Sequence, residues 1–131
     1  MSIQTNCVNT RIFRNTVKVP WHPNLVELYI YCEEKYGVPE VQSAHRDEKV
    51  HSNDSGIHRV IPLRALDWLW THITDIGICQ AIESSVNSEW VYDPQRTHLS
   101  VCKWHTVNPL GRTGWHFHIQ VHDRTVRKKE A

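Results

Sequence analysis

The sequence predicts one domain of the α+β class, with a small, mostly antiparallel sheet and about two helices packed on it. Three observations support this class. The 131 residues suffice for one domain, and the 40% of hydrophobic residues can build a modest core. Helical and strand periodicities both occur, in separate segments of the chain. No internal repeat or Gly/Ser-rich linker divides it.

The first half predicts one helix between two extended segments. Residues 1–20 are irregular and polar and form an arm or a first edge strand. Residues 25–36 place apolar side chains at helical spacing, and Gly37 ends this helix. The apolar positions are Leu25, Leu28, Tyr29, Cys32 and Tyr36. A short strand is expected over about 40–46.

The second half predicts three strands and one helix. Residues 64–72 are rich in large apolar side chains and indicate a buried strand. Thr74 is the expected cap of a helix over 75–88. Residues 98–105 alternate as a strand does, with Leu99, Val101 and Lys103 opposite Ser100, Cys102 and Trp104. A last strand is expected over 115–122.

These elements make a single domain of residues 1–131. Its expected core spans about residues 25–122, preceded by the arm of residues 1–20. Residues 123–131 are expected to be a basic, solvated C-terminal tail.

Composition excludes several classes of protein. Fifteen basic against fourteen acidic residues exclude a strongly basic nucleic-acid wrapper. The four cysteines form no CxxC pair, so a cysteine zinc knuckle is not expected. No apolar run is long enough to span a bilayer, and the N-terminus lacks the pattern of a secretion signal. The expected location is therefore cytoplasmic or virion-associated, without a membrane partner.

A cluster of histidines marks the last predicted strand. The two-residue period of a strand places His116, His118, Gln120 and His122 on one face, opposite Phe117, Ile119 and Val121. Neutral imidazole is a common ligand of zinc and similar metals, so this face is a candidate metal site. A solvated polar face is the simpler interpretation. His105 joins the same face if residues 98–105 and 115–122 pair as a hairpin.

Asp67 stands in the otherwise apolar strand of residues 64–72. A buried carboxylate is costly unless it is ion-paired, hydrogen-bonded or bound to a metal. Two interpretations follow, a salt bridge to Arg64 or another arginine, and a metal ligand.

Four motifs together resemble zinc peptidases related to D-alanyl-D-alanine carboxypeptidases, a superfamily that includes lysostaphin-type and hedgehog-type domains. In chain order they are Ala44-His45-Arg46, Ser55-Gly56-Ile57-His58, Arg64-Ala65-Leu66-Asp67 and Trp115-His116-Phe117-His118. The family pattern is an arginine after the first strand, a stretch SxHxxGxAxD, and a late WH or HxH. Many small phage and bacterial cell-wall peptidases belong to this superfamily.

The resemblance implies a zinc site and a role for each matching residue. His58, Asp67 and His118 would be the protein ligands of Zn²⁺, with water at the fourth position. His116 would bind or deprotonate that water or stabilise the oxyanion. Arg46 would bind a substrate carboxylate. The implied activity is hydrolysis of a peptide bond in a peptidoglycan-type peptide.

The sequence departs from the family pattern at two places. The family histidine lies seven residues before the aspartate, where this chain has Val60; His58 lies nine before it, and His51 is an alternative ligand. Many members carry an acidic residue three positions before the last histidine ligand, where this chain has Trp115. The general base would then be His116, His105 or a distant acid such as Glu89 or Asp93.

Three other functions remain open. The metal site could persist without activity in a binding or virion-structural module. His116-Phe117-His118 also matches the motif of HUH endonucleases, which use a metal and a tyrosine nucleophile. Here the last tyrosine, Tyr92, precedes that motif, and the near-zero net charge fits DNA poorly. The third alternative is a metal-free globular protein.

Overall fold

The computed structural model of the protein describes residues 6–7, 12, 16–17, 20–43, 62–106 and 114–128. Its main sheet has five strands in the order β1-β2-β3-β6-β5. The strands are β1 (Asn6–Cys7), β2 (Glu40–Ser43), β3 (Ala65–Leu69), β5 (Cys102–His105) and β6 (His116–Gln120). All neighbouring pairs are antiparallel except β1 and β2, which are parallel. The predicted α+β class and the mostly antiparallel sheet are confirmed.

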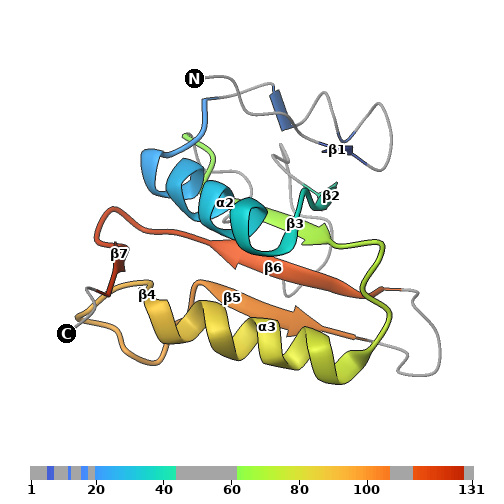
Figure 1. Ribbon diagram of the computed structural model, residues 1–131. Coiled ribbons are helices and arrows are strands. Elements are labelled where there is room, and N and C mark those ends of the chain that lie inside the picture. Colours follow the sequence, from blue (N-terminus) through green and yellow to red (C-terminus); the bar gives the residue numbers. More distant parts are fainter. Residues whose placement is uncertain are drawn as a thin grey trace.

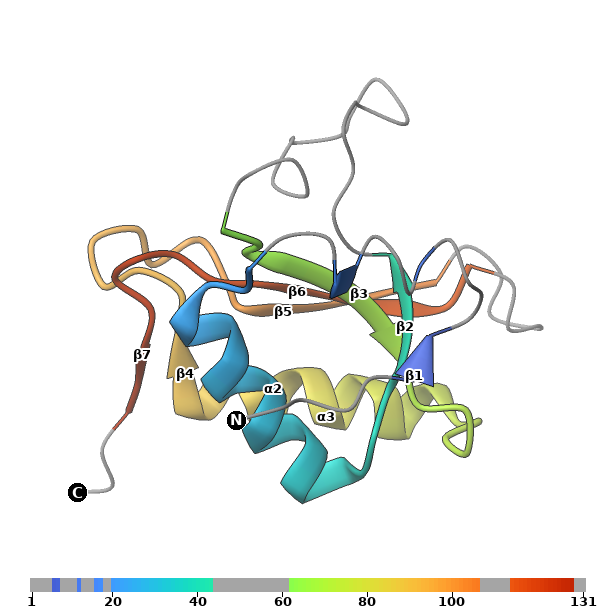
Figure 2. The same cartoon turned by 90° about the horizontal axis from the view of Figure 1, so that it is seen from above.

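Two helices, α2 (Pro23–Tyr36) and α3 (Ile76–Glu89), lie on one side of this sheet (Figure 1; Figure 2). Both helices were expected: α2 begins two residues earlier than predicted and ends at Tyr36 as predicted, and α3 is shifted by one residue at each end. The predicted cap Thr74 is wrong. The cap is Asp75, because its carboxylate accepts the backbone N–H of Ile78 at 3.1 Å and so satisfies a donor of the first turn.

The core between helices and sheet is built on aromatic side chains. Trp68, Tyr29 and Phe117 are fully buried, and Trp70 is 1% exposed. Tyr29 of α2 meets Trp68 of β3 edge to face at 5.7 Å, and Trp70 meets Phe117 of β6 at 5.2 Å. The Trp70 Nε1–H donates to the carbonyl of Gly37 at 2.7 Å. These contacts fix the helix side of β3 and β6, so their alternate residues point to the other side.

Three predicted strands are shorter than expected. Residues 64–72 form a strand only over Ala65–Leu69, because the chain turns at Thr71 and His72. Residues 98–105 form a strand only over Cys102–His105, and residues 115–122 only over His116–Gln120.

The predicted alternation in the second of these strands does not continue to Lys103. Cys102 and Trp104 pair with Ile119 and Phe117 on the core side, whereas Lys103 pairs with His118. The bend at Val101 interrupts the two-residue period, so Lys103 does not share a face with the apolar side chains before it.

The two ends of the chain are also placed in sheets. Asn6–Cys7 is the edge strand expected within residues 1–20. Part of the expected C-terminal tail, β7 (Val126–Arg127), pairs antiparallel with β4 (Trp90–Val91) in a second, two-stranded sheet. Both residues are exposed, as expected of a solvated tail, but their pairing in a sheet was not predicted. In the described part of the chain, no helix is long and apolar enough to cross a membrane.

Candidate functional site

Three adjacent strands present a group of polar side chains on the sheet face opposite α2 and α3. We call this group the polar face; it consists of Asp67, Lys103, His105, His116, His118 and Gln120. The strand register places His118 between Asp67 of β3 and Lys103 of β5, and His116 opposite His105. The predicted face of His116, His118 and Gln120 is confirmed, and β5–β6 pairing adds His105 as expected.

Asp67 and His118 contact each other across the β3–β6 pair. The Asp67 Oδ1 atom lies 3.0 Å from His118 Nδ1. The two side chains are only 14% and 18% exposed, respectively. Because both side chains are largely buried, water screens their charges only weakly. A proton or a metal ion held between Asp67 Oδ1 and His118 Nδ1 would therefore interact strongly with both atoms. The alternative partner Arg64 is directed elsewhere, with its Nη2 donating to Asp123 at 2.9 Å.

His118 also contacts Gln120 of its own strand. His118 Nε2 lies 3.1 Å from Gln120 Oε1, and Gln120 Nε2 donates to the carbonyl of Ser100 at 2.9 Å. Gln120 carries no charge and matches no part of the family pattern, so sequence reasoning placed it on the face without a role. Its spacing of two residues from His118 was the available signal.

His116 and His105 form a stacked pair beside this contact. Their ring centroids are 5.0 Å apart, and the His105 ring lies 6.4 Å from that of His118. His116 Nδ1 lies 2.9 Å from the carbonyl of Gly114. A carbonyl only accepts, so His116 carries its proton on Nδ1, and the other nitrogen, Nε2, can accept a proton.

The pKa of His105 is lowered from its usual value. Burial against its neighbours contributes most, and positive charge on His116 or His118 would lower it further. His105 is therefore an uncharged imidazole at neutral pH. The uncharged His105 ring therefore does not repel a cation bound near His116.

Several predicted site residues cannot be placed or lie elsewhere. His58, Arg46 and His51 lie outside the described residues. His122 does not share the polar face: β6 ends at Gln120, and the following turn packs the His122 ring against Tyr92 at 5.8 Å. Among the residues that the structure describes, no group of three or more His, Cys, Asp or Glu side chains is placed to hold a metal ion.

The acidic candidates for a general base are engaged away from the polar face. Glu89, at the end of α3, lies 3.4 Å from the guanidinium of Arg127. Asp93 accepts from the Arg96 Nε–H at 2.8 Å and is 1% exposed. Neither contacts a histidine of the polar face among the described interactions, so the two remaining candidates are His116 and His105.

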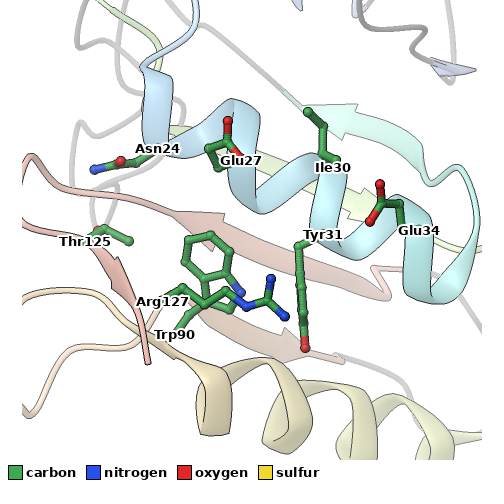
Figure 3. A pocket seen from close by; sticks show the side chains of 8 residues that line it. All are labelled: Asn24, Glu27, Ile30, Tyr31, Glu34, Trp90, Thr125 and Arg127. Carbon is green, nitrogen blue, oxygen red and sulfur yellow. The ribbon is translucent and has the colours of Figure 1, made fainter. Parts of the chain in front are cut away.

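A separate hollow of about 470 Å³ lies between α2 and the β4–β7 sheet (Figure 3). Figure 3 shows the Arg127 side chain between Trp90 and Tyr31, and its guanidinium lies 4.7 Å from the Tyr31 ring centroid. The lining contains no histidine or cysteine. Arg127 also pairs with Glu89 at 3.4 Å, and both side chains of this pair are exposed.

No protein-family model matches the sequence, and neither a curated protein nor a solved structure matches it. The assignment of function therefore depends on the chemistry of the polar face.

Proposed function

We propose that the protein is a zinc-dependent peptidase-like protein in which Asp67 and His118 are two of the metal ligands. The observation that carries this proposal is the 3.0 Å contact between Asp67 Oδ1 and His118 Nδ1. Two ligand atoms about 2.0–2.1 Å from a tetrahedral zinc lie about 3.3 Å apart. A small increase in the distance between Asp67 Oδ1 and His118 Nδ1 would therefore make room for the ion. Aspartate and histidine are both zinc ligands.

The third protein ligand must come from outside the described residues, since those residues hold no complete ligand group. The resemblance to zinc peptidases assigns this place to His58, with His51 as the alternative. A fourth, open position for water is what a hydrolytic zinc requires.

The bound zinc would acidify a water molecule and polarise the scissile carbonyl. His116 is suited to accept the proton of that water, because its Nδ1–H is held by Gly114 and its Nε2 can take up a proton. His105 stacks on His116 and orients its ring. Arg46 would bind the carboxylate of the substrate, for which we propose a peptidoglycan-type peptide.

A metal-binding module without turnover is the second candidate. Within the described part of the polar face, Asp67 is the one carboxylate, and the proposal uses it as a ligand. The base is then a histidine rather than the acidic residue of many related peptidases. This observation favours a weak or inactive version of the same site.

The endonuclease alternative lacks a suitably placed nucleophile. Tyr29, Tyr31 and Tyr36 lie on α2, on the opposite side of the sheet from His116 and His118. The fourth tyrosine, Tyr92, is 6% exposed and packs against His122. DNA nicking is therefore not expected.

The decisive experiment is metal analysis of the purified full chain by elemental mass spectrometry. Asp67→Ala and His118→Ala are compared with His98→Ala, which removes an exposed histidine away from the polar face. About one zinc per chain is expected in the wild-type protein and in His98→Ala, and little in the other two variants. Equal zinc in all four proteins, or none in the wild type, would contradict the proposal.

Turnover is then tested on peptidoglycan peptides. Zinc-dependent release of a fragment by the wild-type protein, lost in His116→Ala with zinc retained, supports the peptidase. Zinc binding without release supports the module.

A further inference from the structure

The hollow between α2 and the β4–β7 sheet carries an excess of negative charge. Glu27 and Glu34 line it from α2, and both side chains are exposed. Within the described part of the chain, neither carboxylate takes part in a hydrogen bond or an ion pair. Among the described residues of the lining, Arg127 carries the one positive charge, and it is paired with Glu89. The hollow is therefore complementary in charge to a basic ligand.

The spacing of the two carboxylates limits which basic ligands fit. Glu27 and Glu34 are seven residues apart on one helix, so they share a face of α2 and lie about 10.5 Å apart along its axis. Ile30 and Tyr31 line the stretch between them (Figure 3). In an extended peptide, two residues separated by three positions lie about 10 Å apart. Two basic side chains at such positions can therefore reach both carboxylates at once.

The wall opposite α2 contains a buried hydrogen-bond donor without an acceptor. Trp90 lines the hollow and is 7% exposed, and its Nε1–H has no hydrogen-bond partner in the described structure. An indole nitrogen only donates, and leaving such a donor buried and unpaired is costly. A ligand with a carbonyl oxygen would satisfy it. A peptide carries a carbonyl at every residue, whereas a protonated polyamine carries no acceptor.

Arg127 occupies the place that a basic ligand would take. Its guanidinium lies 4.7 Å from the ring centroid of Tyr31, on the Trp90 side (Figure 3). This cation–π contact indicates that the aromatic wall accepts a positively charged group. The Arg127 side chain is 56% exposed and its pair with Glu89 is exposed as well, so these contacts hold it weakly. Arg127 is thus an internal competitor that a ligand can displace.

We propose that this hollow is a binding site for an extended basic peptide. Two cationic side chains of the peptide pair with Glu27 and Glu34, and a backbone carbonyl accepts from Trp90 Nε1–H once Arg127 has moved aside. The helix that carries both carboxylates lies on the side of the main sheet opposite the polar face (Figure 2). The inference therefore does not depend on the proposed zinc site.

The experiment is an NMR titration of the full-length chain with the capped peptide acetyl-GKGGKG-amide. A chelator is present, so that no metal-dependent cleavage of the peptide takes place. We expect saturable binding and a shift of the Trp90 indole N–H resonance, because this donor acquires an acceptor. The same titration is repeated with the uncharged peptide acetyl-GQGGQG-amide and with spermidine, which carries positive charge without a carbonyl.

Matched variants test the residues of the hollow. Glu27→Gln and Glu34→Gln are each expected to raise the Kd of the lysine peptide by about two- to fivefold, as for the loss of one exposed ion pair. Glu33→Gln makes the same change on the same helix outside the lining and should leave the Kd unchanged. Arg127→Gln should lower the Kd by about two- to fivefold, whereas Lys128→Gln, its neighbour outside the lining, should not.

Each alternative outcome overturns a stated part of the proposal. If neither the wild type nor Arg127→Gln binds the lysine peptide saturably, the hollow is not a site for basic peptides. Equal binding of the uncharged peptide would exclude recognition by charge, and an unchanged Kd in both glutamate variants would exclude this hollow as the site. Spermidine binding as tightly as the peptide, with the Trp90 resonance unmoved, would show that a polyamine is the better ligand.

Discussion

Asp67 and Asp93 each lie beside a histidine, and their surroundings differ in kind. Asp93 accepts from the backbone N–H of Gln95 at 2.9 Å and from Arg96 at 2.8 Å, with Arg124 Nη1 at 3.6 Å. All of these groups are donors, and they stabilise the charged carboxylate. The nearby His122 Nδ1, at 3.9 Å, adds little.

Asp67 faces a different kind of atom. His118 Nδ1 lies 3.0 Å from its Oδ1, and His118 Nε2 lies 3.1 Å from Gln120 Oε1, so both ring nitrogens face acceptors, and the contact of Asp67 with His118 is favourable when a proton or a metal ion lies between them. The comparison teaches that distance to a histidine does not identify a metal ligand. The groups that a carboxylate already accepts from matter as well, because Asp93 is held by the Gln95 N–H and by Arg96.

The largest expected effect is on thermal stability, and it distinguishes Asp93 from Asp67. Asp93→Ala leaves Arg96 and the Gln95 N–H without their acceptor, and we expect the Tm to fall by on the order of 10 °C. Asp67→Ala should lower the Tm of the metal-free protein by less than about half of that, because the contact with His118 that it removes is with an imidazole and not with a guanidinium. Melting curves followed by circular dichroism decide this, and a larger loss in Asp67→Ala would reverse the comparison.

The next effect is on acid stability. The hydrogen bond from Arg96, followed by that from the Gln95 N–H, lowers the pKa of Asp93 below its usual 3.8. A lowered pKa means that the charged carboxylate stabilises the fold above pH 3.8, and this contribution disappears as the pH falls through the lower folded pKa. Stability of the wild type should therefore fall more steeply below pH 3.8 than that of Asp93→Asn. Urea unfolding at a series of pH values measures it, and parallel curves would contradict the role of Asp93.

A smaller pH effect is expected at the polar face. The pKa of His105 is lowered below 6.5, mainly by burial, so the folded metal-free protein binds this proton less readily than the unfolded chain. Stability is then lost as the pH falls below 6.5, and His105→Gln should weaken that loss. NMR titration of the His105 ring gives the pKa directly. A midpoint above 6.5 would exclude the proposed environment.

The smallest effect should come from Arg127→Ala, at the rim of the hollow between α2 and the β4–β7 sheet. The ion pair of Arg127 with Glu89 is exposed, and pairs of this kind contribute little because water screens them. We expect a change in Tm of about 1 °C or less, which sets the baseline for the other variants. A fall in Tm as large as that of Asp93→Ala would mean that Arg127 contributes more to stability than its contacts indicate.

Much of the architecture could be predicted from local patterns. The apolar spacing from Leu25 to Tyr36 predicted α2, and the alternation of His116, His118 and Gln120 predicted which side of β6 is polar. Periodicity succeeds here because the apolar residues of an amphipathic helix or strand recur at a fixed spacing within one short segment of the chain. The same reasoning failed at His122 and at Lys103, because the end of a strand and a bend depend on contacts with distant residues.

The candidate site divides in the same way. The polar residue Asp67 within an apolar strand and the HxH motif were visible in the sequence, since each is unusual in its own segment. The contact of Gln120 with the Ser100 carbonyl was not visible, because it forms only through the pairing of β5 with β6. The structural role of Asp93 likewise depends on Arg124, thirty-one residues further along the chain.

By itself the sequence determined the α+β class, the two helices and the polar side of the histidine strand, because these follow from the period of apolar side chains along the chain. Only the tertiary structure decided which groups each carboxylate meets. The reason is that hydrogen-bond complementarity is a property of pairs of atoms, and strand register brings those atoms together from segments that carry no common pattern.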